Sequence, residues 1–221
     1  KMKKIISYIA TIVLIGTNAI CAANKTVPVL PENFNQIVQE AAKYQSGDSM
    51  VSLRQIEALI LKCKDNPQLK VEIETSLESI LNSDSTIEAK KFACQQLAII
   101  GPVKSLNTLG KLASVELTSG YACLAIVNSP SPDATKVLYA AYPEANLTAK
   151  IQIINAIGNR QDASAVPFLK QRLLEEKVVE YVLTALGKIG TKTAADTILE
   201  FKKQCQPSYL NAVDDSLLLC A

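Results

Sequence analysis

The residues of this 221-residue chain best suited to chemistry are its cysteines. Six are present and histidine is absent, so a zinc site would have no imidazole ligand to combine with these scattered thiols. Their spacing is wide and contains no Cys-x-x-Cys motif. Cys94 and Cys123 stand at a position that related segments fill with Ile154 and Leu183, which predicts buried packing residues. Equivalent residues of neighbouring units lie about 10 Å apart, too far for a disulfide bond between these two.

Adjacent carboxylates are the second candidate for chemistry. Glu175 and Glu176, like Asp214 and Asp215, are neighbours in sequence, and such neighbours point in different directions on a helix. Solvated surface is therefore favoured over an acid–base pair. Without histidine, Ser–His and Cys–His catalysis is excluded, whereas a Ser–Lys arrangement stays open. No glycine-rich phosphate-binding motif is present. We predict no catalytic, cofactor-binding or metal-binding residues.

Basic residues crowd the last two complete repeat units, with carboxylates interleaved among them. They are Lys150, Arg160, Lys170, Arg172, Lys177, Lys188, Lys192, Lys202 and Lys203. This mixture is typical of a solvated helix surface, and the alternative is a basic ridge for an acidic protein or an anionic glycan. The chain has only three arginines, Arg54, Arg160 and Arg172, so we predict no nucleic-acid partner.

The N-terminal residues 1–23 have the layout of a secretory signal peptide. A basic start, "KMKK", precedes a 12-residue apolar run and a small-residue segment. Cleavage is expected after Ala22 or Ala23, and it would change the net charge from +2 to about −1 by removing three lysines. Lipidation at Cys21 is the alternative, disfavoured by the bulky Ile20 before it. We expect a periplasmic or secreted protein with no membrane contact after cleavage.

The remaining chain shows helical periodicity almost throughout. We divide it into an extended leader (24–31), irregular N-terminal helices or a cap (32–84) and repeats (85–221). Helices are expected at 33–45, 49–64, 67–82, 86–100, 103–113, 116–127, 132–142, 147–158, 163–175, 177–189, 192–204 and 208–220. Expected N-caps are Ser85, Ser131, Asp162 and Thr191, and expected C-caps are Gly101 and Gly190.

One helix–turn–helix unit recurs four times. A small residue falls at Ala98, Val127, Gly158 and Gly187, and an apolar residue closes each segment at Leu109, Leu138, Leu169 and Ile198. Both series step by 29, 31 and 29 residues. Units of two short helices must stack to share one core. We expect the small residue to let the two helices of a unit approach, and Pro167 to bend its helix.

The segments "ALGKIGTKTAADTIL" and "AIGNRQDASAVPFL" resemble HEAT repeats of the short bacterial type, the class grouped with phycobilin lyases. The resemblance covers about residues 86–221 and extends to the repeat portions of secreted bacterial proteins, whereas 32–82 match only as generic helices. It implies an all-α fold, an α-solenoid of antiparallel helix pairs, with a binding or scaffolding role. The apolar end from Leu217 to Ala221 suggests truncation there, or docking on another subunit.

We therefore expect a non-catalytic exported module, not an enzyme, that binds another protein or another domain of its parent chain. The second helices of the units would form the binding groove, lined by Tyr121, Asn155 and Tyr181 if they face inward. The alternatives are a spacer domain of a larger secreted enzyme, and a bilin-lyase-like or other enzymatic HEAT protein. Helical-repeat DNA glycosylases are disfavoured, because their aromatic, arginine-rich groove has no counterpart here.

Overall fold

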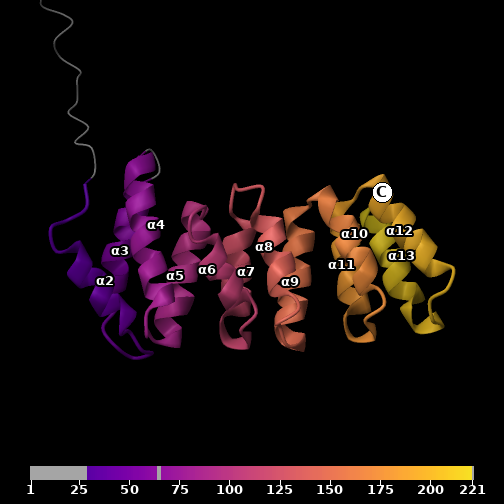
Figure 1. Ribbon diagram of the computed structural model, residues 1–221, viewed down its shortest axis with the longest axis horizontal. Helices are drawn as coiled ribbons and strands as arrows, with labels where there is room; N and C mark the ends of the chain where they lie inside the picture. The colour runs from indigo at the N-terminus through magenta and orange to yellow at the C-terminus, as the bar shows by residue number, and fades with distance from the viewer. Residues whose placement is uncertain (1–28, 64–65, 221) are drawn as a thin grey trace, which may run out of the picture.

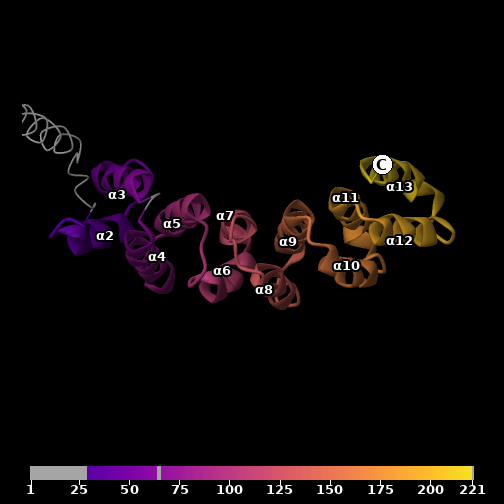
Figure 2. The same cartoon turned by 90° about the horizontal axis from the view of Figure 1, so that it is seen from above.

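The structure, a computed structural model, describes residues 29–63 and 66–220. The expected signal peptide (1–23) and most of the leader lie outside these residues. Within the described part every regular element is helical, and the helices follow one another along an elongated molecule (Figure 1), alternating between two rows (Figure 2). Viewed from above, the rod bends so that one row follows its concave side (Figure 2). The predicted α-solenoid fold is confirmed.

The two rows are built from alternating helices of the chain. The inner, concave row contains α3 (Val51–Lys62), α5 (Ile87–Ile100), α7 (Glu116–Val127), α9 (Leu147–Arg160), α11 (Val179–Ile189) and α13 (Leu210–Leu219). The outer row contains α2 (Phe34–Ala42), α4 (Pro67–Asn82), α6 (Leu106–Ala113), α8 (Ala134–Ala141), α10 (Val166–Arg172) and α12 (Lys192–Lys202). Short 3-10 turns, Ala163–Ala165, Glu176–Val178 and Pro207–Tyr209, lead into α10, α11 and α13.

One apolar seam runs along the molecule between the rows. Its largest fully buried side chains include one from each of the helices α4 to α9: Ile73, Leu97, Leu109, Ile126, Leu138 and Ile153. Cys94 and Cys123 lie in this seam as free, buried thiols, at the same register as Ile154 and Leu183. Their prediction as packing residues is confirmed. Stacking thus buries a stripe that no single short hairpin could bury alone.

The small residues of the repeat serve a different contact from the one predicted. A Cβ atom at Gly158 would lie 2.7 Å from Cα of Ala185, and one at Gly187 would lie 2.8 Å from the carbonyl oxygen of Ser216. Both neighbours belong to the next helix of the inner row. The expectation that these residues bring together the two helices of one unit is wrong, because they set the spacing between successive units.

Several predicted helix ends are found as expected. The side chain of Asp162 accepts a hydrogen bond from the Ser164 N–H, and Thr191 accepts one from the Ala194 N–H. Gly101 (φ 68°) and Gly190 (φ 65°) end α5 and α11 in the left-handed conformation that glycine adopts without strain.

Three local predictions are wrong. Thr86, not Ser85, caps α5, because the Ser85 hydroxyl donates to the Ile80 carbonyl instead. The helix α8 begins two residues later than Pro132, and the Ser131 hydroxyl accepts from the Asp133 N–H within the preceding turn. Pro167 lies in the first turn of α10, where its missing N–H breaks no helical hydrogen bond, so no bend is needed.

Two charged groups, the buried Glu74 and the partly buried Arg160, connect consecutive units through backbone atoms. Oε1 of Glu74, whose residue is 2% exposed, accepts from Ser105 Oγ and from three backbone N–H groups that precede α6, those of Val103, Lys104 and Ser105. The Arg160 guanidinium donates to the carbonyls of Ile126, Val127, Ser129 and Ser131 and to the Thr135 hydroxyl. Each group satisfies the free polar groups of a neighbouring helix end.

Candidate functional site

The exposed side of the inner row repeats one four-residue stripe from helix to helix. On each helix the stripe occupies positions i, i+3, i+4 and i+7, which lie on one face. On α7 it contains Leu117, Gly120, Tyr121 and Leu124; on α9, Thr148, Ile151, Gln152 and Asn155; on α11 and the 3-10 turn before it, Lys177, Glu180, Tyr181 and Thr184. The corresponding positions of α5 are Glu88, Lys91, Phe92 and Gln95, of which Phe92 is buried. The repeat period therefore builds a surface that crosses several helices.

The stripe on α7 is the apolar one, and we call its four residues the α7 patch: Leu117, Gly120, Tyr121 and Leu124. Leu117 is 61% exposed and Leu124 49% exposed, whereas the opposite face of α7 is buried in the seam. A helix that is apolar on all sides is ordinarily covered on all sides. The α7 patch thus has the character of a contact surface.

Gly120 lies at the centre of the α7 patch without a structural reason for being glycine. It is helical and exposed, and a Cβ atom there would meet nothing closer than the Gln152 side chain at 3.7 Å. Alanine would therefore fit, and it would favour the helix by roughly 0.5–1 kcal/mol. Gly120 therefore leaves helix backbone exposed where an alanine side chain would fit.

The three residues suggested for a groove all lie on inner-row helices. Tyr121 and Tyr181 occupy the same register of α7 and α11, and Asn155 of α9 lies one turn further along its helix. Tyr121 and Asn155 are half-buried and Tyr181 is 40% exposed. The ammonium group of Lys91 on α5 lies 5.8 Å from the centroid of the Tyr121 ring, a cation–π distance. The structure brings Lys91 and Tyr121 together and spreads the others along the row.

A second polar cluster lies at the edge of the solenoid where outer helices turn into inner ones. Glu175 accepts a hydrogen bond from the Tyr142 hydroxyl (2.9 Å) and pairs with Arg172 (3.1 Å) and Lys150 (3.7 Å). The Arg172 guanidinium lies 4.6 Å from the Phe168 ring centroid, and Phe168 stacks on Tyr139. Beside this cluster is a hollow of about 330 Å³, lined by Ala145, Leu147, Lys150, Glu175, Glu176, Lys177 and Val178.

The environment of this cluster fixes its protonation states. Burial alone would raise the pKa of Glu175, but the hydrogen bonds from Tyr142 and Arg172 and the nearby charge of Lys150 hold that pKa below its usual value. Burial, together with the hydrogen bond to Glu175, raises the pKa of the Tyr142 hydroxyl far above its usual value. Near neutral pH the carboxylate stays charged and the phenol stays neutral.

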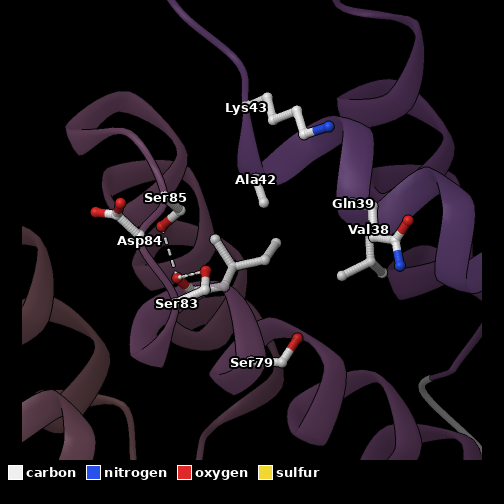
Figure 3. A pocket seen from close by; sticks show the side chains of 9 residues that line it. Val38, Gln39, Ala42, Lys43, Ser79, Ser83, Asp84 and Ser85 are labelled. Atoms are coloured by element: carbon white, nitrogen blue, oxygen red, sulfur yellow. Dashed lines mark hydrogen bonds between the residues drawn. The ribbon is translucent and has the colours of Figure 1, made fainter.

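A hollow of about 380 Å³ lies near the start of the described chain, between α2 and the end of α4 (Figure 3). Its side chains Val38, Gln39, Ala42 and Lys43 face Ser79, Ser83, Asp84 and Ser85 across the gap. The hydroxyls of Ser83 and Ser85 both donate to the Ile80 carbonyl of their own turn. These groups are used to end α4, and they do not converge on a ligand position.

Two further features bear on the chemistry of the described residues. Burial raises the pKa of the Cys94 and Cys123 thiols to about 12, so neither is a thiolate at neutral pH. No group of three potential metal ligands gathers within residues 29–63 and 66–220. In the same part of the chain, every helix lacks the length or the hydrophobicity to cross a bilayer.

Residues of both sites escaped the sequence analysis for identifiable reasons. Glu175 was placed with Glu176 on a solvated surface, but it faces Tyr142, which is 33 residues away in the chain. Gly120 and Lys91 carried no motif. Only their positions in the repeat distinguish them. Residues one period apart fall on one line across four helices, and these residues are Lys91, Gly120, Ile151 and Glu180. Only an alignment of the repeats could have revealed this line of residues.

Comparison with known proteins shows only limited similarity. No protein-family model matches the chain, and no curated protein matches it by sequence. A solved structure of human deoxyhypusine hydroxylase in complex with glycerol is similar, with a TM-score of 0.41 and 13% sequence identity. The similarity covers 85% of this chain and 96% of that one. Both are helical-repeat proteins, and the specific bacterial family suggested by the sequence is not demonstrated.

This finding overturns the functional expectation. The sequence analysis predicted a non-catalytic module and no enzyme, but the similar solved structure is, by its name, that of a hydroxylase. The expectation of a non-catalytic module that is not an enzyme is corrected accordingly.

Proposed function

We propose that this chain is the helical-repeat component of an enzyme, and that its inner row docks a catalytic domain of the same or another polypeptide. The observation that carries this proposal is the α7 patch. Leu117 and Leu124 face outward beside the half-buried Tyr121, on a helix whose other sides are already buried. Such surfaces mark contacts with other proteins.

The shape of the inner row supports a polypeptide partner over a small ligand. The stripe continues from α5 to α11 at the same register, so a partner can follow it across several units. Leu124, Asn155 and Thr184 occupy equivalent positions on three successive helices. The surface changes from apolar to polar along this line, which gives a docked segment a defined direction.

We also propose a cellular location and a repeat family for the chain. The N-terminal sequence favours export, and the repeat segments favour the short bacterial HEAT type found in secreted proteins. In that setting the chain would hold an extracytoplasmic catalytic domain.

Site-specific photocrosslinking in the natural host tests the docking proposal. A photoreactive amino acid replaces Leu124 or Thr184 on the inner row, and Lys136 or Gln171 on the outer row serves as the matched exposed control. We expect both inner positions to capture one polypeptide with a catalytic domain, identified by mass spectrometry, and the outer positions to capture none. Equal capture by both rows, capture of a partner without enzymatic activity, or no adduct from the inner row contradicts the proposal.

A further inference from the structure

We propose that the α7 patch binds an acidic amphipathic segment of the docked polypeptide. A large apolar side chain of that segment lies against the bare backbone of Gly120, and a neighbouring carboxylate reaches the ammonium group of Lys91. This inference rests on the proposed function, because it specifies the chemistry of the polypeptide that the inner row holds.

The first support is the contrast between Gly120 and the other described glycines. Gly158 and Gly187 are required by packing, since a Cβ atom at each would lie within 2.8 Å of a backbone atom of the next helix, and a Cβ atom at Gly110 would lie 2.6 Å from the Val137 side chain. Gly47, Gly101 and Gly190 are required by their positive φ angles. Gly120 has neither requirement, yet glycine is a poorer helix residue than alanine. Its place in the sequence is explained if another chain approaches the helix there.

The second support is the set of side chains around Gly120. Leu117 and Leu124 lie one turn to either side of it along α7, and both are about half exposed or more. Ile151 of α9 occupies the equivalent register on the neighbouring helix and is partly buried. An apolar side chain lying on Gly120 would contact these neighbouring apolar residues and remove their exposed surface from water.

The third support is the charge at the border of the patch. Lys91 occupies the register of Gly120 on α5, and its ammonium group lies over the Tyr121 ring. None of the six ion pairs formed among the described residues includes Lys91. The carboxylate of Glu116, at the start of α7, already accepts from the side chains of Asn146 and Thr148. A half-buried ammonium group beside an apolar surface favours a carboxylate on the incoming partner.

Two synthetic amphipathic peptides of equal length test this chemistry, one of leucine and glutamate and one of leucine and lysine. Each is titrated into the isotopically labelled full chain, and the backbone amide signal of Gly120 is followed by NMR. We expect the glutamate peptide to shift this signal and to bind about fivefold or more tightly than the lysine peptide. The substitution Lys91→Gln should remove that preference.

Gly120→Ala provides the variant that separates binding from folding. Since alanine fits the site, we expect the melting temperature to rise by about 2–4 °C, while the glutamate peptide binds more weakly. A merely structural glycine would give the opposite sign for stability, as Gly158→Ala should. Unchanged peptide binding by Gly120→Ala, or equal binding of both peptides, overturns the proposal.

The other possible occupants are distinguished in the same titration. Concentration-dependent shifts of Gly120 without peptide would identify a second copy of the chain as the occupant, and stronger shifts with anionic phospholipid vesicles would identify a membrane surface. Either result overturns the acidic-segment proposal. The photocrosslinks from Leu124 and Thr184 report docking independently, so they can succeed where the peptide chemistry fails.

Discussion

Gly158 and Ala185 hold α9 and α11 at backbone contact, because a methyl group at Gly158 would lie 2.7 Å from Cα of Ala185. The hindering atom belongs to the main chain, so no side-chain rotation can make room. The two inner helices would have to separate to accept any larger residue. The spacing of the inner row therefore depends on this glycine.

Replacement of Gly158 by alanine should lower the free energy of unfolding. Although alanine favours a helix, the enforced separation of α9 and α11 should cost about 1–3 kcal/mol. Urea denaturation followed by circular dichroism measures the change. A variant as stable as the parent would show that the rows tolerate a wider spacing.

Removal of the Glu74 carboxylate should destabilise the N-terminus of α6. Glu74→Ala leaves three backbone N–H groups and the Ser105 hydroxyl without their acceptor, at a cost of about 1–3 kcal/mol. Glu74→Gln keeps an acceptor oxygen and should cost less. Hydrogen exchange should accelerate at Val103, Lys104 and Ser105 in Glu74→Ala. Unchanged protection there would contradict the role assigned to Glu74.

The buried thiols should make the fold sensitive to alkaline pH. The pKa of Cys94 and of Cys123 is raised to about 12 in the folded chain, against 9.0 when unperturbed. Between these values the unfolded chain loses protons that the folded chain keeps, so stability falls as the pH rises above 9. The fall should be shallower in a Cys94→Ala, Cys123→Ala double variant than in the parent. Equal slopes in urea titrations would refute this assignment.

The Tyr142 hydroxyl should help to keep Glu175 ionised. Tyr142→Phe removes the 2.9 Å hydrogen bond to the carboxylate, so the pKa of Glu175 should rise toward its usual value. Because this pKa is depressed in the folded chain, the associated stability is present above the usual pKa of glutamate and is lost as the pH falls through the lowered value. Carboxyl NMR titration measures the change. Tyr139→Phe, which leaves the Glu175 contacts in place, is the control.

Local signals were sufficient to predict the helices but not their contacts. The bounds of α4 and α7 match the predicted 67–82 and 116–127, because apolar periodicity and turn residues are properties of adjacent residues. Thr191 and Asp162 cap helices for the same reason. Pro167 was misplaced because a 3-10 turn, invisible to periodicity, shifts the start of α10.

Contacts between units depend on how each hairpin rotates against the next, which the sequence does not encode locally. The pairing of Gly158 with Ala185, and that of Tyr142 with Glu175, join residues 27 and 33 positions apart. The register of the inner-row stripe was predictable in principle from the 29- and 31-residue steps. Its exposure was not, because only the stacked rows determine which face of α7 is left open.

The reach of Arg160 has a mechanical consequence. From the end of α9 its guanidinium donates hydrogen bonds to the C-terminal carbonyls of α7 and to carbonyls of the turn before α8. These bonds connect two consecutive hairpins. Hairpins joined only by apolar stacking can peel away one at a time. Under tension the rod should unfold from its ends and stop at the hairpins that Glu74 and Arg160 connect, so that the middle of the molecule unfolds last.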